Sequence, residues 1–318
     1  MAPILSKRPL LPSAGKIALI SPSRWLEPDV IDTAKGLFKA FGHELVVDPQ
    51  NFARAGVLAG TNQERADALM RAFLDPSIEA ILCARGGTGA TYFLDLLDYE
   101  IIKAHPKPLI GFSDVTGLLN AITTQTGVIT YYGPTASYLV DPRCADRVTR
   151  DMLETVASPA KTLQRTFQAR ALATAAREGT GQGQLFGGNL SVLSSLLGTP
   201  YEWPDENVIL LLEDVQEPLY KIERMINHLR LAGKLQNITA LLVGEMVGIL
   251  DDQPDLDPMV HTRYGRSLIQ IIMDNIPQHV PVFFDLPIGH GSGLVTMPVG
   301  AEAMVTIQNN QCELMVTS

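Results

Sequence analysis

Residues 78–89 read IEAILCARGGTG, and this stretch decides the fold class. The apolar run Ile78–Ala84 predicts a short buried strand, and the glycine-rich turn Arg85–Gly89 follows it directly. Four more short apolar runs, separated by segments of helical character, share this half of the chain. They are Lys16–Ile20, Glu44–Val47, Pro108–Phe112 and Gly127–Tyr132. Strands that alternate with helices predict βαβ units, and therefore a parallel sheet covered by helices on both faces.

Local signals place two helices between these strands. Apolar residues recur at helical spacing over residues 31–41, and Gly42 is expected to end that helix. Thr61 and Glu64 have the spacing of a capping box, which predicts a helix from there to about Leu74.

The stretch Asp141–Gly183 differs in composition from what precedes it. It is rich in Ala, Thr, Arg and Gln with weak periodicity, and we interpret it as a helix followed by a linker that is flexible near Gly179–Gly183. We therefore expect an N-terminal α/β domain over residues 1–150, a linker over 151–183 and a second domain over 184–318.

The second half predicts a smaller domain rich in strands. Val208–Leu212 is a strongly apolar strand, and Leu219–Leu229 carries an apolar stripe at helical spacing. Apolar alternation on both sides of Asn309-Asn310 predicts a terminal hairpin.

Composition excludes several classes of protein. With 46% hydrophobic and 19% charged residues, the chain is not disordered, collagen-like or a coiled coil. A net charge of −9 argues against a nucleic-acid partner, and no apolar window reaches the ~18 residues that span a membrane. Cys83, Cys144 and Cys312 fit neither a disulfide framework nor a zinc site, and no metal or cofactor is expected. The first residues make a poor secretory signal, so we expect a cytoplasmic protein.

Ser113 lies where a predicted strand meets a predicted helix, in the sequence LIGFSDV. Such a turn can lift a serine hydroxyl clear of the backbone as a nucleophile, although the full G-x-S-x-G pattern is absent because Val115 takes the last glycine position. The alternative is that Ser113 caps the following helix.

The turn Arg85–Gly89 also has two interpretations. Its glycines allow backbone amides to approach a ligand, as an oxyanion hole requires. It lacks the sequence of a phosphate-binding loop or of a dinucleotide fingerprint. Alternatively, it is no more than a tight strand-to-helix turn.

Three further residues are candidates for acid–base chemistry. Glu213 and Asp214 end an apolar strand, where α/β proteins direct side chains into sites, although solvated strand ends look the same. As neighbours on a strand, they are expected to point to opposite faces. His290 stands in the glycine-rich loop PIGHGSG. A serine, an acid and a histidine together supply what a serine hydrolase needs.

At this point the chain resembles the LD-carboxypeptidases, serine peptidases that remove the terminal D-alanine from muropeptide tetrapeptides. The resemblance runs from about Lys16 to Gly300, with all blocks in order. These blocks are ARGGTGATYFLDLLD, KPLIGFSDVTGLLNAI, YYGPTA, GGNLSVLSSLLGTP, LLLEDVQEPLYKIERMINHLRLAG and LPIGHGSG.

The resemblance implies a site and a fold. The family's catalytic serine, glutamate and histidine correspond to Ser113, Glu213 and His290, and the backbone amides of Gly87 and Asp114 would form the oxyanion hole. The implied fold is a flavodoxin- or Rossmann-like parallel α/β domain followed by a smaller β-rich domain, often dimeric, with the site between them; we expect a homodimer. Recognition of the substrate's terminal carboxylate needs a cation or helix amides, and the cation candidate is Arg85.

Two departures from the family pattern bear on the substrate. Thr88 stands where an aromatic residue usually follows the RGG turn, and Leu294 stands where an asparagine is common. A rival within the fold is a hydrolase like the microcin C immunity proteins, which act on aminoacyl- or peptidyl-adenylate analogues and stack aromatic residues on the base. A rival of another class is a non-catalytic binding protein.

Overall fold

The computed structural model describes residues 9–142, 145–159, 163–168, 177–249, 264–291 and 293–317. The chain forms two compact units. Unit 1 contains residues 1–163 and 292–301, and unit 2 contains residues 164–291 and 302–317. The chain therefore returns to unit 1 directly after His290, for one short strand, before it completes unit 2.

Unit 1 is built on a six-stranded sheet in the order β11-β5-β4-β3-β1-β2. Five strands are parallel, and β11 pairs antiparallel with β5. All five strands predicted from the first half of the sequence are confirmed. The strands are β1 Lys16–Ile20, β2 Glu44–Val47, β3 Ile78–Cys83, β4 Leu109–Gly111, β5 Thr130–Tyr132 and β11 Met297–Val299.

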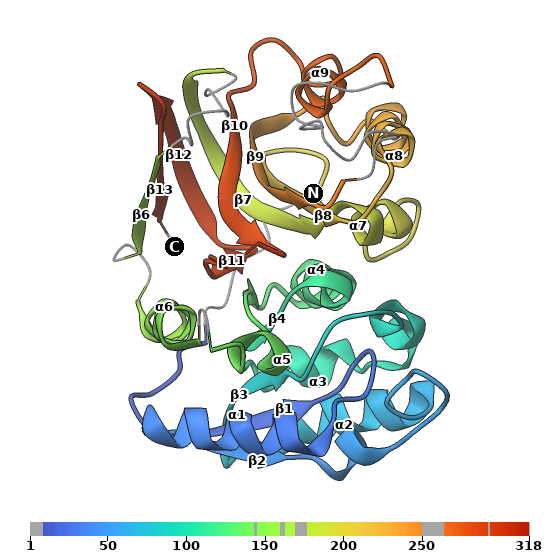
Figure 1. The fold of residues 1–318 in the computed structure, drawn as a ribbon, viewed down its shortest axis with the longest axis vertical. Coiled ribbons are helices and arrows are strands. Elements are labelled where there is room, and N and C mark those ends of the chain that lie inside the picture. Colours follow the sequence, from blue (N-terminus) through green and yellow to red (C-terminus); the bar gives the residue numbers. More distant parts are fainter. Residues whose placement is uncertain are drawn as a thin grey trace. The chain divides into compact units, whose positions relative to one another are not determined.

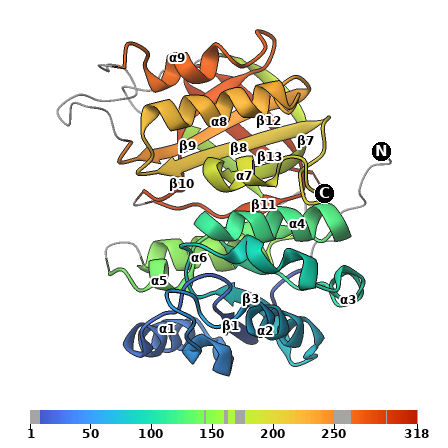
Figure 2. The same ribbon diagram turned by 90° about the vertical axis from the view of Figure 1, so that its right-hand side faces the viewer.

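Helices cover both faces of this sheet, as predicted. Figure 2 shows α1, α5 and α6 toward one side of the strands and α2, α3 and α4 toward the other. The predicted capping box at Thr61 and Glu64 is present and begins α2. The helices are α1 Pro28–Ala40, α2 Asn62–Leu74, α3 Tyr99–Ala104, α4 Thr116–Thr126, α5 Ala136–Leu139 and α6 Ala145–Ala157, with short 3₁₀ helices η1 Pro49–Phe52, η2 Ala90–Leu96 and η3 Ser113–Val115.

Unit 2 is built on a seven-stranded mixed sheet in the order β10-β9-β8-β7-β12-β13-β6. The strands β7 to β10 are parallel, while β12, β13 and β6 add antiparallel pairs. The strands are β6 Gln164–Gln168, β7 Gly179–Asn189, β8 Val208–Val215, β9 Ile238–Val247, β10 Val282–Gly289, β12 Glu302–Gln308 and β13 Gln311–Val316.

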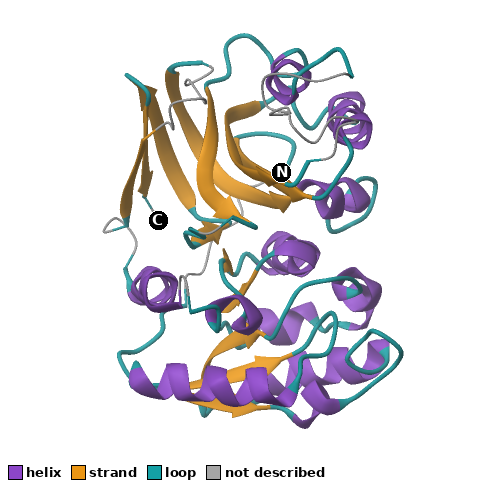
Figure 3. Ribbon diagram, in the orientation of Figure 1, coloured by secondary structure: helices purple, strands orange, loops and turns teal. Residues whose placement is uncertain are grey.

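The helices of unit 2 lie on one side of its sheet (Figures 1 and 3). They are α7 Leu190–Leu196, α8 Leu219–Leu231 and α9 Leu268–Met273. The predicted hairpin is confirmed, since β12 and β13 pair around Asn309 and Asn310, both at positive φ. Asparagine is among the few residues that tolerate this conformation in a tight turn.

The prediction that Gly179–Gly183 is flexible is wrong, because these residues form the first half of β7. A Cβ atom at Gly181 would overlap the carbonyl of Thr239, and one at Gly183 would overlap the carbonyl of Asn207. The glycines therefore allow neighbouring backbone to approach the strand closely, which is a regular use of glycine in sheets.

We expect Gly183→Ala to destabilise unit 2 by about 1–3 kcal/mol or more, because the clash is with backbone that cannot rotate away. Gly36→Ala is the control, since an added Cβ in α1 of unit 1 meets no atom within 4 Å and should leave the unfolding transition of unit 2 unchanged. The measurement is urea unfolding in a Trp25→Phe background, where the buried Trp203 reports on unit 2 alone. An unchanged midpoint in Gly183→Ala would contradict this explanation of the glycines.

Candidate active site

Ser113 has the backbone of a nucleophile turn. It follows β4 as the first residue of η3 and has φ of +62°, which is rare and costly for a residue other than glycine. The helix-cap alternative is wrong, because the N-cap position of η3 belongs to Phe112 and carries no side-chain capping bond. The turn is tight enough that a Cβ atom at Gly111 would lie 2.8 Å from Val115. The strand-to-helix junction therefore holds Ser113 in a strained conformation.

The glycine-rich turn after β3 lies directly against Ser113. A Cβ atom at Gly86 would lie 2.9 Å from the Cβ of Ser113 and 3.1 Å from its Oγ, so only glycine allows this approach. Gly87 follows with φ of +127°, a conformation that side chains rarely adopt. Gly86 and Ser113 therefore face each other, and each is followed directly in the chain by a candidate oxyanion-hole residue, Gly87 or Asp114.

The Asp114 side chain ties this turn to the loop after β1. One of its oxygens accepts hydrogen bonds from Ser23 Oγ at 2.6 Å and from the backbone N–H of Ala90 at 2.9 Å. Ala90 begins η2, directly after the glycine-rich turn. One buried carboxylate therefore links the loops that follow β1, β3 and β4.

Arg65 is a positioning residue that the sequence analysis missed. Its guanidinium is 1% exposed and donates to the carbonyls of Pro22 at 2.7 Å and Gly89 at 2.6 Å. A buried cation requires such partners, and these two carbonyls belong to the same loops that Asp114 joins. In the sequence Arg65 is only the fourth residue of the expected helix, which is no specific signal of a role.

Glu213 and His290 form a hydrogen-bonded pair in unit 2. The Oε2 atom of Glu213 lies 2.7 Å from Nδ1 of His290, at the carboxyl ends of β8 and β10. The Glu213 side chain is fully buried, whereas the His290 side chain is 18% exposed. When His290 is neutral, Nδ1–H donates to the carboxylate and Nε2 keeps its lone pair.

Glycines on both sides of His290 make room for buried carboxylates. A Cβ atom at Gly289 would overlap Oε2 of Glu213, and one at Gly291 would overlap the carboxylate of Glu245 from β9. Gly289 also has φ of +110°. Gly289 and Gly291 therefore allow the backbone on both sides of His290 to lie close to the carboxylates of Glu213 and Glu245.

Asp214 shares a hydrogen-bonding partner with Glu213. Asn189 donates from Nδ2 to Oε1 of Glu213 at 3.1 Å and to Oδ1 of Asp214 at 3.0 Å, so the expectation of opposite faces is wrong. The pairing of β8 with β9 shifts register between Leu212 and Asp214, which breaks the simple alternation of side chains. Burial raises the pKa of Asp214 to about 6.

Comparisons with known proteins identify the family of this chain. The family model for the LD-carboxypeptidase N-terminal domain matches residues 17–133. The model for the LD-carboxypeptidase C-terminal domain matches residues 182–305. The chain belongs to the LD-carboxypeptidase family. It is 32% identical to a probable murein peptide carboxypeptidase of Bacillus subtilis, over 90% of this chain and 87% of the relative. It is also 32% identical to the murein tetrapeptide carboxypeptidase of Pseudomonas aeruginosa, over 92% and 94%.

A solved LD-carboxypeptidase structure has the same fold. The muramoyltetrapeptide carboxypeptidase from Oxalobacter formigenes superimposes with a TM-score of 0.82 and 25% identity, covering 95% of this chain and 99% of that one. The family also has a relative with another role, since the microcin C7 self-immunity protein of Escherichia coli is 25% identical over 80% of this chain and 79% of the relative.

The candidate residues of this LD-carboxypeptidase fall into two sets. Ser113, Asp114, Gly87 and Arg85 belong to unit 1, and Glu213 and His290, which contact each other, belong to unit 2. Among the described residues, no group of three or more His, Cys, Asp or Glu side chains could hold a metal ion. Within the same part of the chain, no helix is long and apolar enough to cross a membrane.

The two departures from the family pattern lie in unit 1. The hydroxyl of Thr88 is 3.4 Å from that of Tyr92. Leu294 is buried, and its backbone N–H donates to the hydroxyl of Tyr138 at 3.5 Å.

The buried Asp214 predicts a pH dependence of stability in this LD-carboxypeptidase. Its folded pKa of about 6 is above the ordinary value of 3.8, so the folded state binds the proton more tightly than the unfolded state. Its contribution is therefore fully present below pH 4 and is lost as the pH rises through 6. Relative to Asp214→Asn, the unfolding free energy of the wild type should fall by up to roughly 3 kcal/mol between pH 4 and 7. Urea unfolding across that range measures it, and parallel curves for the two proteins would contradict the assignment.

Proposed function

We propose that the chain is a serine carboxypeptidase that cleaves the L,D-amide bond between the diamino acid and the terminal D-alanine of murein tetrapeptides. The observation that carries this proposal is the 2.7 Å hydrogen bond between a fully buried Glu213 and a partly exposed His290. The relative from Pseudomonas aeruginosa is named for the tetrapeptide reaction, and it aligns over nearly the whole chain.

In this proposal Ser113, His290 and Glu213 act as a catalytic triad, so residues of both units act on one substrate. His290 Nε2 takes the proton from Ser113 Oγ as the hydroxyl oxygen attacks the carbonyl carbon next to D-alanine. Glu213 keeps the proton on Nδ1 and stabilises the imidazolium that forms. His290 then gives its proton to the departing nitrogen of D-alanine, which leaves an ester on Ser113 that water hydrolyses by the same route.

The oxyanion hole in this proposal consists of the backbone N–H groups of Asp114 and Gly87. The positive φ values of Ser113 and Gly87 support this role, as does the close approach of Gly86 to Ser113, because Gly87 and Asp114 directly follow these two approaching residues in the chain. Each donor in such a hole contributes on the order of 3 kcal/mol to catalysis. Asp114 and Arg65 fix the loops, so the donors need little rearrangement during the reaction.

The burial of two aromatic side chains, Phe167 and Trp203, favours the muropeptide over an adenylate analogue. Stacking on a nucleobase needs an exposed ring, but Phe167 on β6 is 7% exposed and Trp203 is 1% exposed. Lys234 Nζ lies 5.5 Å from the centre of the Trp203 ring and covers it further. The sequence between β6 and β7 adds no aromatic residue.

A homodimer and a cytoplasmic location complete the proposal. The homodimer rests on the likeness to the family. Sedimentation equilibrium of the purified chain tests the dimer, and a single species with the mass of one chain would exclude it.

Ser113→Ala is expected to abolish D-alanine release from a murein tetrapeptide while the fold persists. The substitution removes the nucleophile and adds no bulk. The measurement is D-alanine release by purified wild type and variant, with circular dichroism as the folding control. Retention of more than about a hundredth of wild-type turnover would exclude Ser113 as the nucleophile, because the residual rates of triad variants lie far lower.

Glu213→Gln and Asp214→Asn separate the triad acid from its buried neighbour. Glu213→Gln should lower turnover by roughly 10²–10⁴-fold, because an amide favours the wrong tautomer of His290. Asp214→Asn should lower it much less, since Asp214 contacts Asn189 and the backbone N–H groups of Ser191 and Val215 instead of the histidine. Both variants belong in one D-alanine release assay, and the opposite ranking would make Asp214 the triad acid.

A further inference from the structure

A carboxypeptidase must recognise the free carboxylate at the end of its substrate, and we propose that Arg24 binds it. This inference rests on the proposed function and names the group that selects the substrate's terminus. Arg24 lies in the loop between β1 and α1, and the sequence analysis had chosen Arg85 for this role. Three observations within unit 1 favour Arg24.

The first observation is that the Arg24 side chain covers the glycine-rich turn. A Cβ atom at Gly87 would lie 2.7 Å from Cδ of Arg24 and 3.0 Å from its Nε. The preceding residue, Gly86, makes the equivalent approach to Ser113. Gly86 and Gly87 are neighbours, and consecutive Cα atoms are ~3.8 Å apart. The glycine that contacts the Arg24 side chain is therefore only one residue from the glycine that contacts Ser113.

The second observation is that the backbone of Arg24 is fixed relative to that turn. Ser23 donates from Oγ to Asp114, the residue after the nucleophile, and its carbonyl accepts from Ala59 N–H at 3.1 Å. Arg24 itself forms an isolated β-bridge with Leu58.

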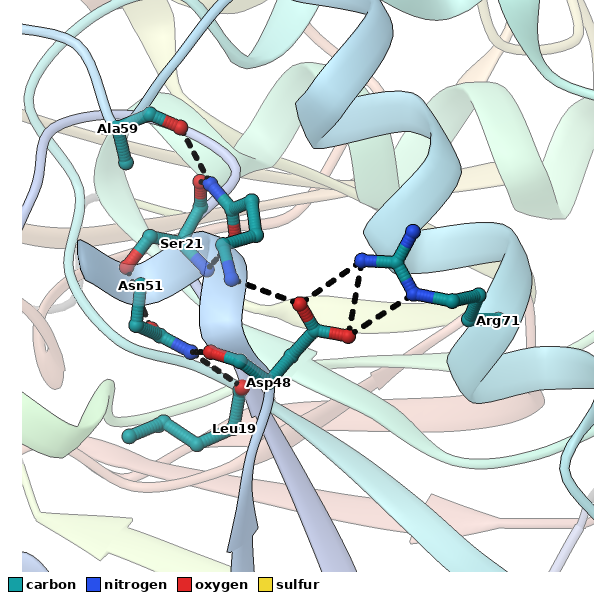
Figure 4. A network of polar contacts seen from close by, with 7 residues as sticks. Leu19, Ser21, Asp48, Asn51, Ala59 and Arg71 are labelled. Atoms are coloured by element: carbon teal, nitrogen blue, oxygen red, sulfur yellow. Dashed lines mark hydrogen bonds and ion pairs between the residues drawn. The ribbon is translucent and has the colours of Figure 1, made fainter. Parts of the chain in front are cut away.

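A polar network anchors the start of the same loop at Ser21. Ser21 Oγ donates to Asn51 at 2.7 Å, and its backbone N–H donates to Gln50 at 3.1 Å. Figure 4 shows this network continuing through Asp48 to Arg71. The loop that carries Arg24 is therefore anchored at Ser21, at Ser23 and by the backbone bridge of Arg24 itself, so its position there does not depend on the exposed Arg24 side chain.

The third observation is that Arg24 is exposed. In the described parts of the chain the structure gives its guanidinium no hydrogen bond or ion pair. Nearby arginines are engaged, since Arg65 is buried against carbonyl oxygens and Arg54 lies 4.2 Å from the centre of the Trp25 ring. The neighbouring carboxylate of Asp114 is occupied by Ser23 and Ala90.

The chemistry of the leaving group fits this position. In a terminal D-alanine only the nitrogen and Cα separate the scissile carbonyl from the carboxylate, so the recognising cation must lie close to the oxyanion turn. A guanidinium offers two parallel N–H donors that match a carboxylate. Arg85 begins the same turn, but within the described part of the chain the atoms nearest a Cβ at Gly86 or Gly87 belong to Phe112, Ser113 and Arg24 and not to Arg85.

The experiment compares two substrates that differ only at the terminus, a murein tetrapeptide ending in D-alanine and the same peptide ending in D-alaninamide. Wild type, Arg24→Ala, Arg24→Lys, Arg85→Ala and Arg54→Ala are assayed for kcat and KM on both. Arg54→Ala is the matched control, because it removes an exposed arginine from the adjacent loop without contact to Gly87.

Arg24→Ala is expected to raise KM for the free acid by roughly 10- to 100-fold, to leave KM for the amide nearly unchanged and so to abolish the preference for the acid. Arg24→Lys should recover part of that preference through its charge. An unchanged acid preference in Arg24→Ala, or its loss in Arg85→Ala alone, would overturn the inference while leaving the proposed function intact. An equal loss of kcat on both substrates would also overturn it, since Arg24 would then position the turn. Failure of the wild type to release D-alanine from the free acid would refute the proposed function itself.

Discussion

The site depends above all on the burial of Glu213 beside His290. A carboxylate removed from water needs hydrogen-bond donors, and this one has His290 Nδ1 and the amide of Asn189. The need for space around it explains why residue 289 must be glycine, since a Cβ there would overlap the carboxylate. In the proposed mechanism, a histidine held in one tautomer by this buried acid is what makes Ser113 reactive.

In unit 1 the main structural constraint is the strained backbone of Ser113, which the surrounding loops must hold in place. The positive φ of Ser113 costs free energy that the surrounding structure must offset. Asp114 and Arg65 supply this support by connecting the loops at the ends of three strands through short hydrogen bonds. The network at Ser21 extends the same support outward to the loop that carries Arg24. In the proposed mechanism this rigidity serves the reaction, because preorganised donors need no rearrangement as charge develops.

The strands of unit 1 could be predicted because each is a short apolar run followed by turn residues, and the hairpin could be predicted because Asn309-Asn310 suits a tight turn. The glycines of β7 misled the prediction, since their purpose depends on carbonyl groups of β8 and β9 that lie far away in the sequence. The register shift beside Asp214 could not be predicted either, because it arises from pairing between strands.

The candidate site residues also divide into those that local sequence patterns predict and those that only tertiary contacts reveal. Ser113, Glu213 and His290 stand in recognisable local patterns, so the sequence alone identified them as candidates. The supporting roles of Asn189 and Arg65, and the binding role proposed for Arg24, rest on contacts across the fold, and no local pattern marks those residues. Sequence patterns thus indicate which groups could react, and the structure adds what holds them in place.

The central claim is that His290 activates Ser113, and labelling with a fluorophosphonate probe tests it most directly. Such a probe reacts only with a serine whose proton is being taken by a base, and mass spectrometry identifies the modified residue. The account predicts a single label on Ser113 in the wild type and labelling slowed by at least about a hundredfold in a folded His290→Gln variant. A label on a different serine, or equal labelling rates in the two proteins, would contradict it.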